Sequence, residues 1–461
     1  MSEGASHAER ARPEGELSPP HAHEMQAPQA NGREAPNAGR FGRLTWLVPL
    51  AGVLLAGAAL RLVAADDMEY KADEKWTFDQ TQPSSDRSFP WLGMPSSAGM
   101  DNPGMSVWVF MALGKLLGVD DPVSLARAVQ WLNVAAILLQ VAFAWRCVPW
   151  PDREFWLWSA AFLCVNPLAV LFHRKIWPPS VLPIFIVALL IAWWFRQRPW
   201  AAFAWGLVGA AIGQIHMSGF HFAAAAVLWT WWFGDKRTAW KSWTAGSVLG
   251  VLPMIPWLKY LIATHGSRPS ANVKWEHLFE AKFWLRWFSE PFGWGADYAL
   301  GDDFRDFLSQ PIVAGQATWL VGLLHVAAIA SAVGLLVRIY RQRGTLFGAA
   351  ARVQVRLPTV MAQDFALWGY GILLTLTLTP IHCHYMLIAY PMEFLWLARM
   401  ALGAQPDRSR RAMIGRALLA GMCLVQLLIS ASFLGYIHVK QRIDGDYGVV
   451  YRAQVERQPL R

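Results

Sequence analysis

The amino-acid sequence predicts an all-α polytopic membrane protein, on three observations. Of the 461 residues, 55% are hydrophobic and only 16% are charged, whereas soluble domains carry about 25% charged residues. Several apolar runs approach the ~20 residues that span a bilayer as a helix. The 27 tryptophans suit a chain with many membrane–water interfaces, where indole rings settle. Together these observations exclude a soluble fold, a fibrous protein and a disulfide scaffold.

The chain divides into a tail, a membrane domain and a second tail. Residues 1–43 are rich in Pro, Ala, Glu and Arg, which predicts a disordered cytoplasmic tail. Residues 44–437 form the predicted transmembrane domain, residues 438–461 form the C-terminal tail, and no internal repeat is evident. We expect about eleven spans, at 45–64, 125–145, 155–172, 179–195, 201–216, 219–233, 243–263, 312–337, 365–381, 385–398 and 417–437.

Charge sets the expected orientation. The net charge is +9, and the basic residues gather in short loops at 235–241, 338–358 and 399–416. Basic loops of this kind are typical of the cytoplasmic side of membrane proteins. The positive charge therefore indicates membrane orientation and not nucleic-acid binding. Two long loops, 66–124 and 264–311, then face outward. The C-terminal tail is an exception, because an odd span count places it outside although it is basic. Either the tail tolerates its charge or the count is off by one.

Cysteine usage indicates neither a disulfide framework nor a metal site. The four cysteines lie in four different segments without CxxC spacing, and we interpret them as free core thiols: Cys147, Cys164, Cys383 and Cys423.

The first outer loop opens with five acids within nine positions: Asp66, Asp67, Glu69, Asp73 and Glu74. A carboxylate at an apolar interface loses hydration, which raises its pKa and makes it a better base. Two adjacent carboxylates are also candidate ligands for a divalent cation. The alternative is a solvated acidic loop that helps to set topology.

Cations and histidines cluster at the predicted outer helix ends. Arg174 and Lys175 follow a span at the depth of a lipid phosphate, which Arg binds as a bidentate fork; the alternative is membrane snorkelling. The histidines offer hydrogen bonds to phosphate or sugar, and none has the i, i+4 spacing of a helical metal motif: His173, His216, His221, His382 and His384.

The second outer loop and one intramembrane acid complete the candidates. Residues 275–288 have near-helical apolar spacing, which predicts a helix lying in the interface. The Gly- and aromatic-rich stretch 293–304 suits stacking on sugar faces, or packing alone. Glu393 lies inside a predicted span, where acids are functional candidates, and either His325 or a wet cavity is its expected partner.

Several motifs resemble the GT-C superfamily of membrane glycosyltransferases, which includes protein O-mannosyltransferases and lipid A aminoarabinose transferases. The resemblance covers most of residues 45–400, in hydrophobic pattern more than in identity. The motifs are Leu60-Arg61-Leu62 followed by an Asp-Glu pair, Asn102-Pro103-Gly104, Asn166-Pro167, His173-Arg174 and His384-Tyr385-Met386-Leu387.

The resemblance implies a GT-C-like bundle, in a bacterial inner membrane, that moves a sugar from a polyprenyl-phosphate donor to an extracytoplasmic hydroxyl of a glycan, lipid or protein, usually with inversion. The family's base maps onto Asp73, with Glu74 as its neighbour and both as candidate Mg or Mn ligands. His173, Arg174, Lys175, His384, Tyr385, Asp67 and Glu69 map onto substrate binding. The second acid that relatives carry after the Arg is missing here, which leaves metal dependence open.

Two other functions remain open. A transporter or lipid flippase predicts inverted repeats, broken helices and mid-membrane charges, of which the sequence shows only the one charge, Glu393. A non-catalytic assembly subunit would tolerate the loss of Asp73.

Overall fold

The computed structural model describes most of the chain, and all that follows concerns its larger unit, Val48–Arg461. Residues 1–37 of the expected tail lie outside the described residues, and helix α1 (Ala38–Leu62) begins within that tail. The described residues are 38–82, 88–96, 100–150, 152–234, 236–265, 274–346, 357–403 and 409–456.

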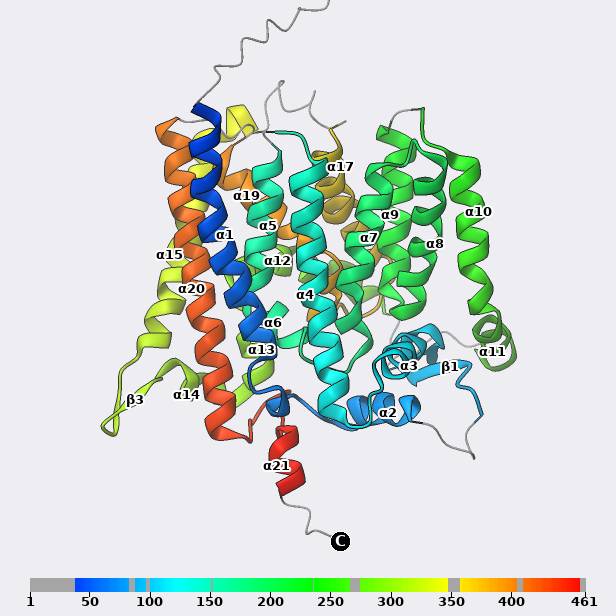
Figure 1. Ribbon diagram of the computed structural model, residues 1–461, viewed down its shortest axis with the longest axis horizontal. Helices are drawn as coiled ribbons and strands as arrows, with labels where there is room; N and C mark the ends of the chain where they lie inside the picture. Colours follow the sequence, from blue (N-terminus) through cyan, green and yellow to red (C-terminus); the bar gives the residue numbers. More distant parts are fainter. Residues whose placement is uncertain are drawn as a thin grey trace, which may run out of the picture. The chain divides into compact units, whose positions relative to one another are not determined.

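The protein is a bundle of helices, as the composition predicts. Within the described residues, all eleven predicted apolar runs coincide with helical segments, and four helices are long and apolar enough to cross a membrane: Pro122–Cys147, Trp240–Thr264, Leu320–Gly344 and Arg410–Lys440. After α1, the bundle elements are α4 (Pro122–Cys147), α5 (Arg153–Val165), α6 (Pro167–Phe172), η2 (Pro178–Val181), α7 (Leu182–Trp194), α8 (Pro199–Ile215), α9 (Ser218–Phe233), α10 (Trp240–Val251), α11 (Ile255–His265), α15 (Leu320–Leu346), α17 (Pro358–Asp364), α18 (Gly371–Leu376), α19 (Tyr390–Leu402) and α20 (Arg410–Lys440). Figure 1 shows the long helices among them, such as α4, α8, α9, α10, α15 and α20, running roughly side by side.

Two predicted spans have different boundaries in the structure. The run at 312–337 opens as a hairpin of β3 (Ile312–Val313) and β4 (Gln316–Ala317), and the helix starts only at Leu320. Both central residues of the two-residue turn, Ala314 and Gly315, have positive φ, as a tight hairpin requires. The span predicted at 365–381 starts earlier, at Pro358, which occupies the first helical turn where proline is favoured.

Both long loops contain ordered elements. The first holds α2 (Ala72–Thr81), β1 (Leu92–Pro95), β2 (Asp101–Pro103) and α3 (Met105–Leu117). The second holds η4 (Trp275–Phe279), α12 (Lys282–Ser289), α13 (Ala296–Leu300) and α14 (Phe304–Leu308). The predicted interfacial helix at 275–288 is therefore two short helices. Phe283 and Trp287 of α12 are fully buried, and Figure 1 places α12 at mid-height in the bundle.

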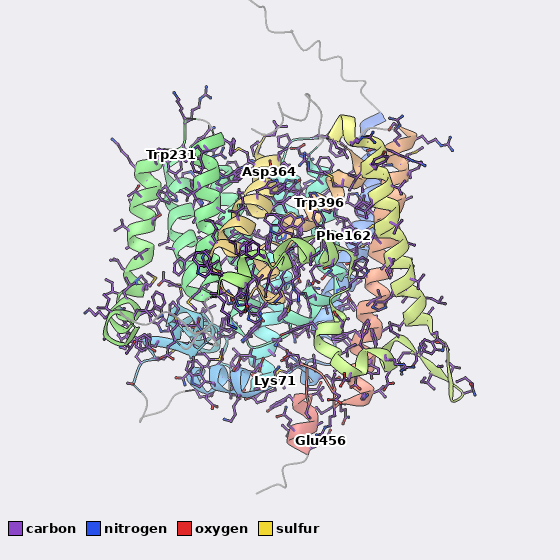
Figure 2. All side chains as sticks on the ribbon, turned by 180° about the vertical axis from the view of Figure 1, so that it is seen from behind. Lys71, Phe162, Trp231, Asp364, Trp396 and Glu456 are labelled. Atoms are coloured by element: carbon purple, nitrogen blue, oxygen red, sulfur yellow. The ribbon has the colours of Figure 1, made fainter. Side chains whose placement is uncertain are left out.

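The C-terminal segment returns to the first loop. Val450 forms a β-bridge with Glu69, and the Tyr451 N–H donates to the Met68 carbonyl at 3.0 Å. Helix α21 (Tyr451–Glu456) follows. Figure 2 shows Lys71 and Glu456 at one end of the unit and Trp231 near the other. We call this end, where the first loop and the C-terminal segment meet, the loop end.

Ion pairs explain why a basic C-terminal tail lies at the loop end. Lys440 pairs with Asp303 at 2.5 Å, and Arg452 pairs with Asp67 at 3.0 Å. Because acids of both long loops neutralise these cations, the odd span count and the basic tail are compatible.

Helix α1 packs closely against α5 through one glycine. A Cβ added at Gly57 would lie 2.6 Å from the Cβ of Cys164, whereas a Cβ at Gly52 would meet nothing within 4 Å. Position 57 therefore sets how closely the two helices approach.

We expect Gly57→Val to lower the thermal unfolding midpoint of the detergent-purified protein, because overpacking costs roughly 1–3 kcal/mol. The matched variant, Gly52→Val on the same helix, should leave the midpoint near that of the wild type. Equal midpoints for the two variants would contradict this packing.

Candidate active site

Two buried arginines tie the ends of α1 and α5 to each other. Arg61 of α1 donates to the carbonyls of Leu163 and Cys164, each at 2.7 Å. These are among the last carbonyls of α5, which lack helical partners because the helix ends before Pro167. The negative end of a helix dipole favours a cation at this position. Arg61 therefore caps α5.

Arg174 does the same for α1. Its guanidinium donates to four carbonyls at the end of that helix, at 2.7–3.0 Å: Leu60, Arg61, Val63 and Ala64. The side chain is 3% exposed. We define this arrangement of Arg61 and Arg174 as the reciprocal caps. The guanidinium predicted to bind phosphate is thus engaged with the backbone.

The caps bring Lys175 to the acids of the first loop. The Lys175 ammonium lies 2.7 Å from a carboxylate oxygen of Glu69 and 3.5 Å from one of Glu74. All three side chains are at most 5% exposed. Lys71 contacts the other oxygen of Glu69 at 2.5 Å and also pairs with Asp446. We call Glu69, Glu74, Lys71 and Lys175 the lysine cluster.

Burial dominates the electrostatics of Glu69. Loss of hydration raises the pKa of its carboxyl above the ordinary value of 4.5, while Lys175 acts in the opposite direction and Glu74 adds to the rise. A buried carboxylate with a raised pKa beside a cation is the environment in which general bases occur.

Aromatic rings continue the cluster on the other side of Lys175. Its ammonium lies 4.8 Å from the ring centroid of Trp177, and Trp177 meets His384 edge to face at 4.6 Å. The ring centroid of His384 in turn lies 5.3 Å from that of His216, 5.4 Å from that of His382 and 4.7 Å from that of Tyr385. We call these five residues the ring cluster. It joins elements from three separate parts of the chain.

The second loop reaches the same place through Tyr298. The Tyr298 ring stacks on Phe172 with 6.2 Å between the ring centroids, and Phe172 stacks on Trp177 with 5.8 Å between theirs. The carboxylates of the first loop, Lys175, and a set of rings that includes Tyr298 of the second loop therefore converge at the site. Such an arrangement of few polar groups among aromatic walls is typical of small-molecule sites.

The remaining predicted site residues lie elsewhere. Asp73 is exposed on α2, outside the lysine cluster. Asp67 is held by His438 at 2.6 Å and by Arg452 at 3.0 Å. His173 accepts from Arg61 at 2.9 and 3.1 Å, which makes it a partner of the caps.

A divalent cation does not fit between Asp73 and Glu74. Neighbours on a helix point about 100° apart, and here one side chain is exposed and the other buried. One Glu74 oxygen already accepts from the Lys71 backbone N–H at 2.9 Å, and Lys175 faces the other. Among the described residues, no three or more His, Cys, Asp or Glu side chains gather as metal ligands.

Three residues at the site were not singled out from sequence: Lys71, Trp177 and Asp446. Tyr298, in contrast, lies in the stretch 293–304 that was expected to stack on sugar faces. Trp177 lies two residues after Lys175, and a tryptophan this close to a cationic pair was a usable signal. Asp446 gave none, because only the returning C-terminal segment brings it to Lys71.

Comparisons with known proteins gave few matches. No protein-family model and no curated protein matches the sequence. Among solved structures, the chain is similar to ArnT from Cupriavidus metallidurans in the apo state, with a TM-score of 0.49 and 13% identity, over 86% of this chain and 78% of that one. It is also similar to the same protein bound to undecaprenyl phosphate, with a TM-score of 0.45 and 12% identity, over 87% and 78% of the two chains.

Removing the lysine tests whether the buried cluster is a linked unit. We expect Lys175→Met to destabilise the protein by roughly 3–5 kcal/mol, because it removes the buried cation of Glu69 and Glu74 and leaves only Lys71 to pair with Glu69. Adding Glu69→Gln to Lys175→Met should recover much of this loss. Thermal unfolding in detergent measures both, and a stable single variant or a double variant without recovery would contradict the pairing.

Proposed function

We propose that the protein is a GT-C-type membrane glycosyltransferase that takes a sugar from a polyprenyl-phosphate donor and gives it to an acceptor hydroxyl. The reaction takes place at the loop end, which we place outside the cytoplasm of a bacterial inner membrane. The observation that carries this proposal is the buried Glu69–Lys175 pair beside Trp177 and His384.

The reaction needs a base on one side of the sugar and a cation on the other. The acceptor hydroxyl gives its proton to a carboxylate while its oxygen bonds to the anomeric carbon. The bond from that carbon to the phosphate oxygen breaks, and the electron pair leaves with the phosphate. A cation aimed at this developing charge acts strongly in a low-dielectric site.

Lys175 is the cation we assign to the carrier phosphate. Its ammonium is buried and already pairs with carboxylates at 2.7 and 3.5 Å, so an arriving phosphate replaces one anionic partner of Lys175 with another, while Lys71 stays paired with Glu69. Arg174, by contrast, would have to leave four carbonyls of α1. Lys175 can therefore meet phosphate at a smaller structural cost.

Glu69 is the base we assign, in place of Asp73. Its pKa is raised by burial, and a base works best when its pKa approaches the operating pH. Lys175 lowers the pKa of Glu69. When phosphate draws Lys175 away, this lowering is lost and Glu69 becomes a stronger base. Glu74 is less free, because it also caps the start of α2.

The ring cluster is the surface we assign to the sugar. Trp177 and His384 lie next to Lys175, so a sugar held on the rings would place its phosphate linkage near the ammonium. Aromatic faces give contact area, and the His and Tyr polar atoms give hydrogen bonds that orient the sugar.

Substitution separates the two candidate bases. With a radiolabelled polyprenyl-phosphate sugar and purified enzyme, Glu69→Gln should lower the transfer rate by about 10²–10⁴-fold, the usual contribution of a general base. Asp73→Asn, four residues further along the chain and exposed in the first turn of α2, should retain most of the activity.

Two results would overturn this assignment. Loss of transfer in Asp73→Asn with transfer retained in Glu69→Gln would return the base to Asp73. Accumulation of lipid-linked sugar across sealed vesicles without any glycosyl product would instead make the protein a transporter.

The rate should also depend on pH in a definite direction. Because Glu69 must be ionised to accept a proton, activity is retained above its pKa and lost as pH falls through it. Burial raises that pKa, so the acidic limb of the pH profile should lie above the ~4.3 of an exposed glutamate. Asp73→Asn should keep this limb, and an acidic limb at or below the exposed value would contradict the role of Glu69.

A further inference from the structure

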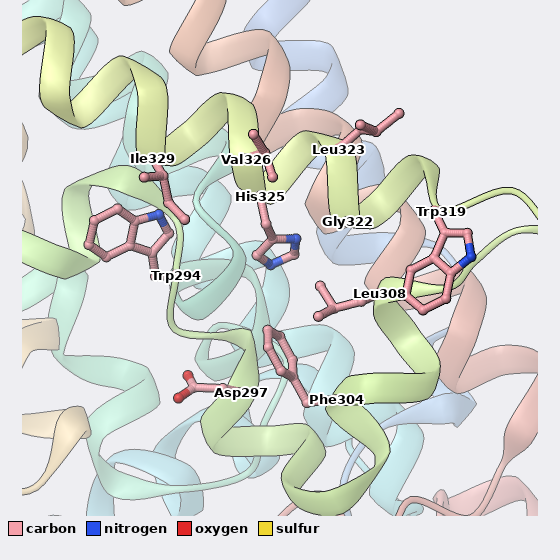
Figure 3. A pocket seen from close by; sticks show the side chains of 10 residues that line it. All are labelled: Trp294, Asp297, Phe304, Leu308, Trp319, Gly322, Leu323, His325, Val326 and Ile329. Carbon is pink, nitrogen blue, oxygen red and sulfur yellow. The ribbon is translucent and has the colours of Figure 1, made fainter.

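A cavity lies between α15 and the second loop, and none of its lining residues belongs to the lysine or ring cluster. It has a volume of about 830 Å³ and is lined by Trp294, Asp297, Phe304, Leu308, Trp319, Gly322, Leu323, His325, Val326 and Ile329. Figure 3 shows side chains of α15 facing those of the loop across it. We call it the lateral pocket.

The rim of the lateral pocket faces lipid. Leu323 and Val326 lie on α15, a helix long and apolar enough to span a membrane, and are 63% and 61% exposed. Aliphatic side chains exposed on such a helix contact hydrocarbon. Trp319 stands half exposed just before the helix begins, as indoles do at the headgroup level. The pocket therefore opens into the membrane just below one interface.

The charges of the pocket exclude a phosphate as its partner. Asp297 and His325 are its ionisable lining groups, and its lining residues include no Lys or Arg. An anionic headgroup would meet a carboxylate there and no cation. The polar part of a ligand that enters must donate hydrogen bonds.

His325 supplies the matching acceptor. Its Nδ1 lies 2.8 Å from the Val321 carbonyl, which can only accept, so Nδ1 carries the proton and Nε2 of the neutral ring is an acceptor. Nε2 is buried and has no hydrogen-bond partner in the described structure, and the side chain is 9% exposed. In Figure 3 the ring extends from α15 into the middle of the lining residues.

We propose that the lateral pocket binds the acyl chain of a membrane lipid whose chain root carries an amide N–H or a hydroxyl, and that this donor bonds to His325. The aliphatic rim holds the chain, and Asp297 favours a donor over an anion. An ester-linked chain lacks that donor. Chain linkage is thus the feature by which the pocket selects its lipid.

The pocket and the proposed active site share α13. Asp297 lines the pocket, and the next residue, Tyr298, stacks on Phe172. A bound lipid would lie one short helix from the ring cluster. The lipid proposal does not depend on the transferase assignment, because binding can be measured without turnover.

Photolabelling tests the lateral pocket directly. The full-length protein in phosphatidylcholine nanodiscs would receive one of two lipids that have the same diazirine acyl chain. One lipid carries this chain through an amide bond, and the other is a phosphatidylglycerol that carries it through an ester bond. We expect peptides containing 294–308 and 319–329 to be labelled, about fivefold more by the amide lipid, the effect of one net hydrogen bond. His325→Leu should bring the two lipids to equal labelling.

Filling the pocket supplies the matched control. Val326→Trp occupies the rim and should abolish labelling of these peptides, whereas Val333→Trp, two turns further along α15 and also exposed, should not. Leu323→Trp repeats the test if Val326→Trp does not elute as a monodisperse protein. Unchanged labelling in the filled variant, or equal labelling by both lipids in the wild type, would overturn the proposal.

Discussion

The site depends on the reciprocal caps. Arg61 of α1 bonds to the last carbonyls of α5, and Arg174, which follows α6, bonds to the last carbonyls of α1. Buried charge-assisted hydrogen bonds therefore fix the end of α1 against the end of α5 and against the segment after α6. Lys175 directly follows one cap, and Glu69 lies a few residues beyond the helix that the other belongs to. With the caps in place, the Glu69–Lys175 pair forms between two buried side chains, and its geometry is set before any ligand arrives.

Two environments of opposite character then lie on either side of α13. On one side, the lysine cluster offers a buried cation that can exchange its carboxylate for another anion. On the other side, the lateral pocket has the acid Asp297 and the unpartnered acceptor of His325, and its lining residues include no Lys or Arg. On these two proposals, a phosphate headgroup and a hydrogen-bond-donating lipid chain would bind at different places. This separation would let one protein hold two lipids without exchanging them.

Hydropathy predicted the spans well, because the length and apolarity of a span are properties of a short stretch of sequence. It did not predict α3, which lies in the predicted first loop outside every predicted span, or the burial of α12. The acids show the same limit. Asp73 and Glu74 are equivalent in sequence, but α2 begins at Ala72 and turns only Glu74 inward. The joining of Glu69 to Lys175 depends on contacts over more than a hundred residues, which no local pattern encodes.

The most direct test of this account is an experimental structure of the protein with a polyprenyl phosphate bound. The account predicts the phosphate within hydrogen-bond distance of the Lys175 ammonium, the Glu69–Lys175 contact lengthened, and both arginine caps intact. A phosphate bound by the Arg174 guanidinium, or held away from an undisturbed Glu69–Lys175 pair, would contradict it.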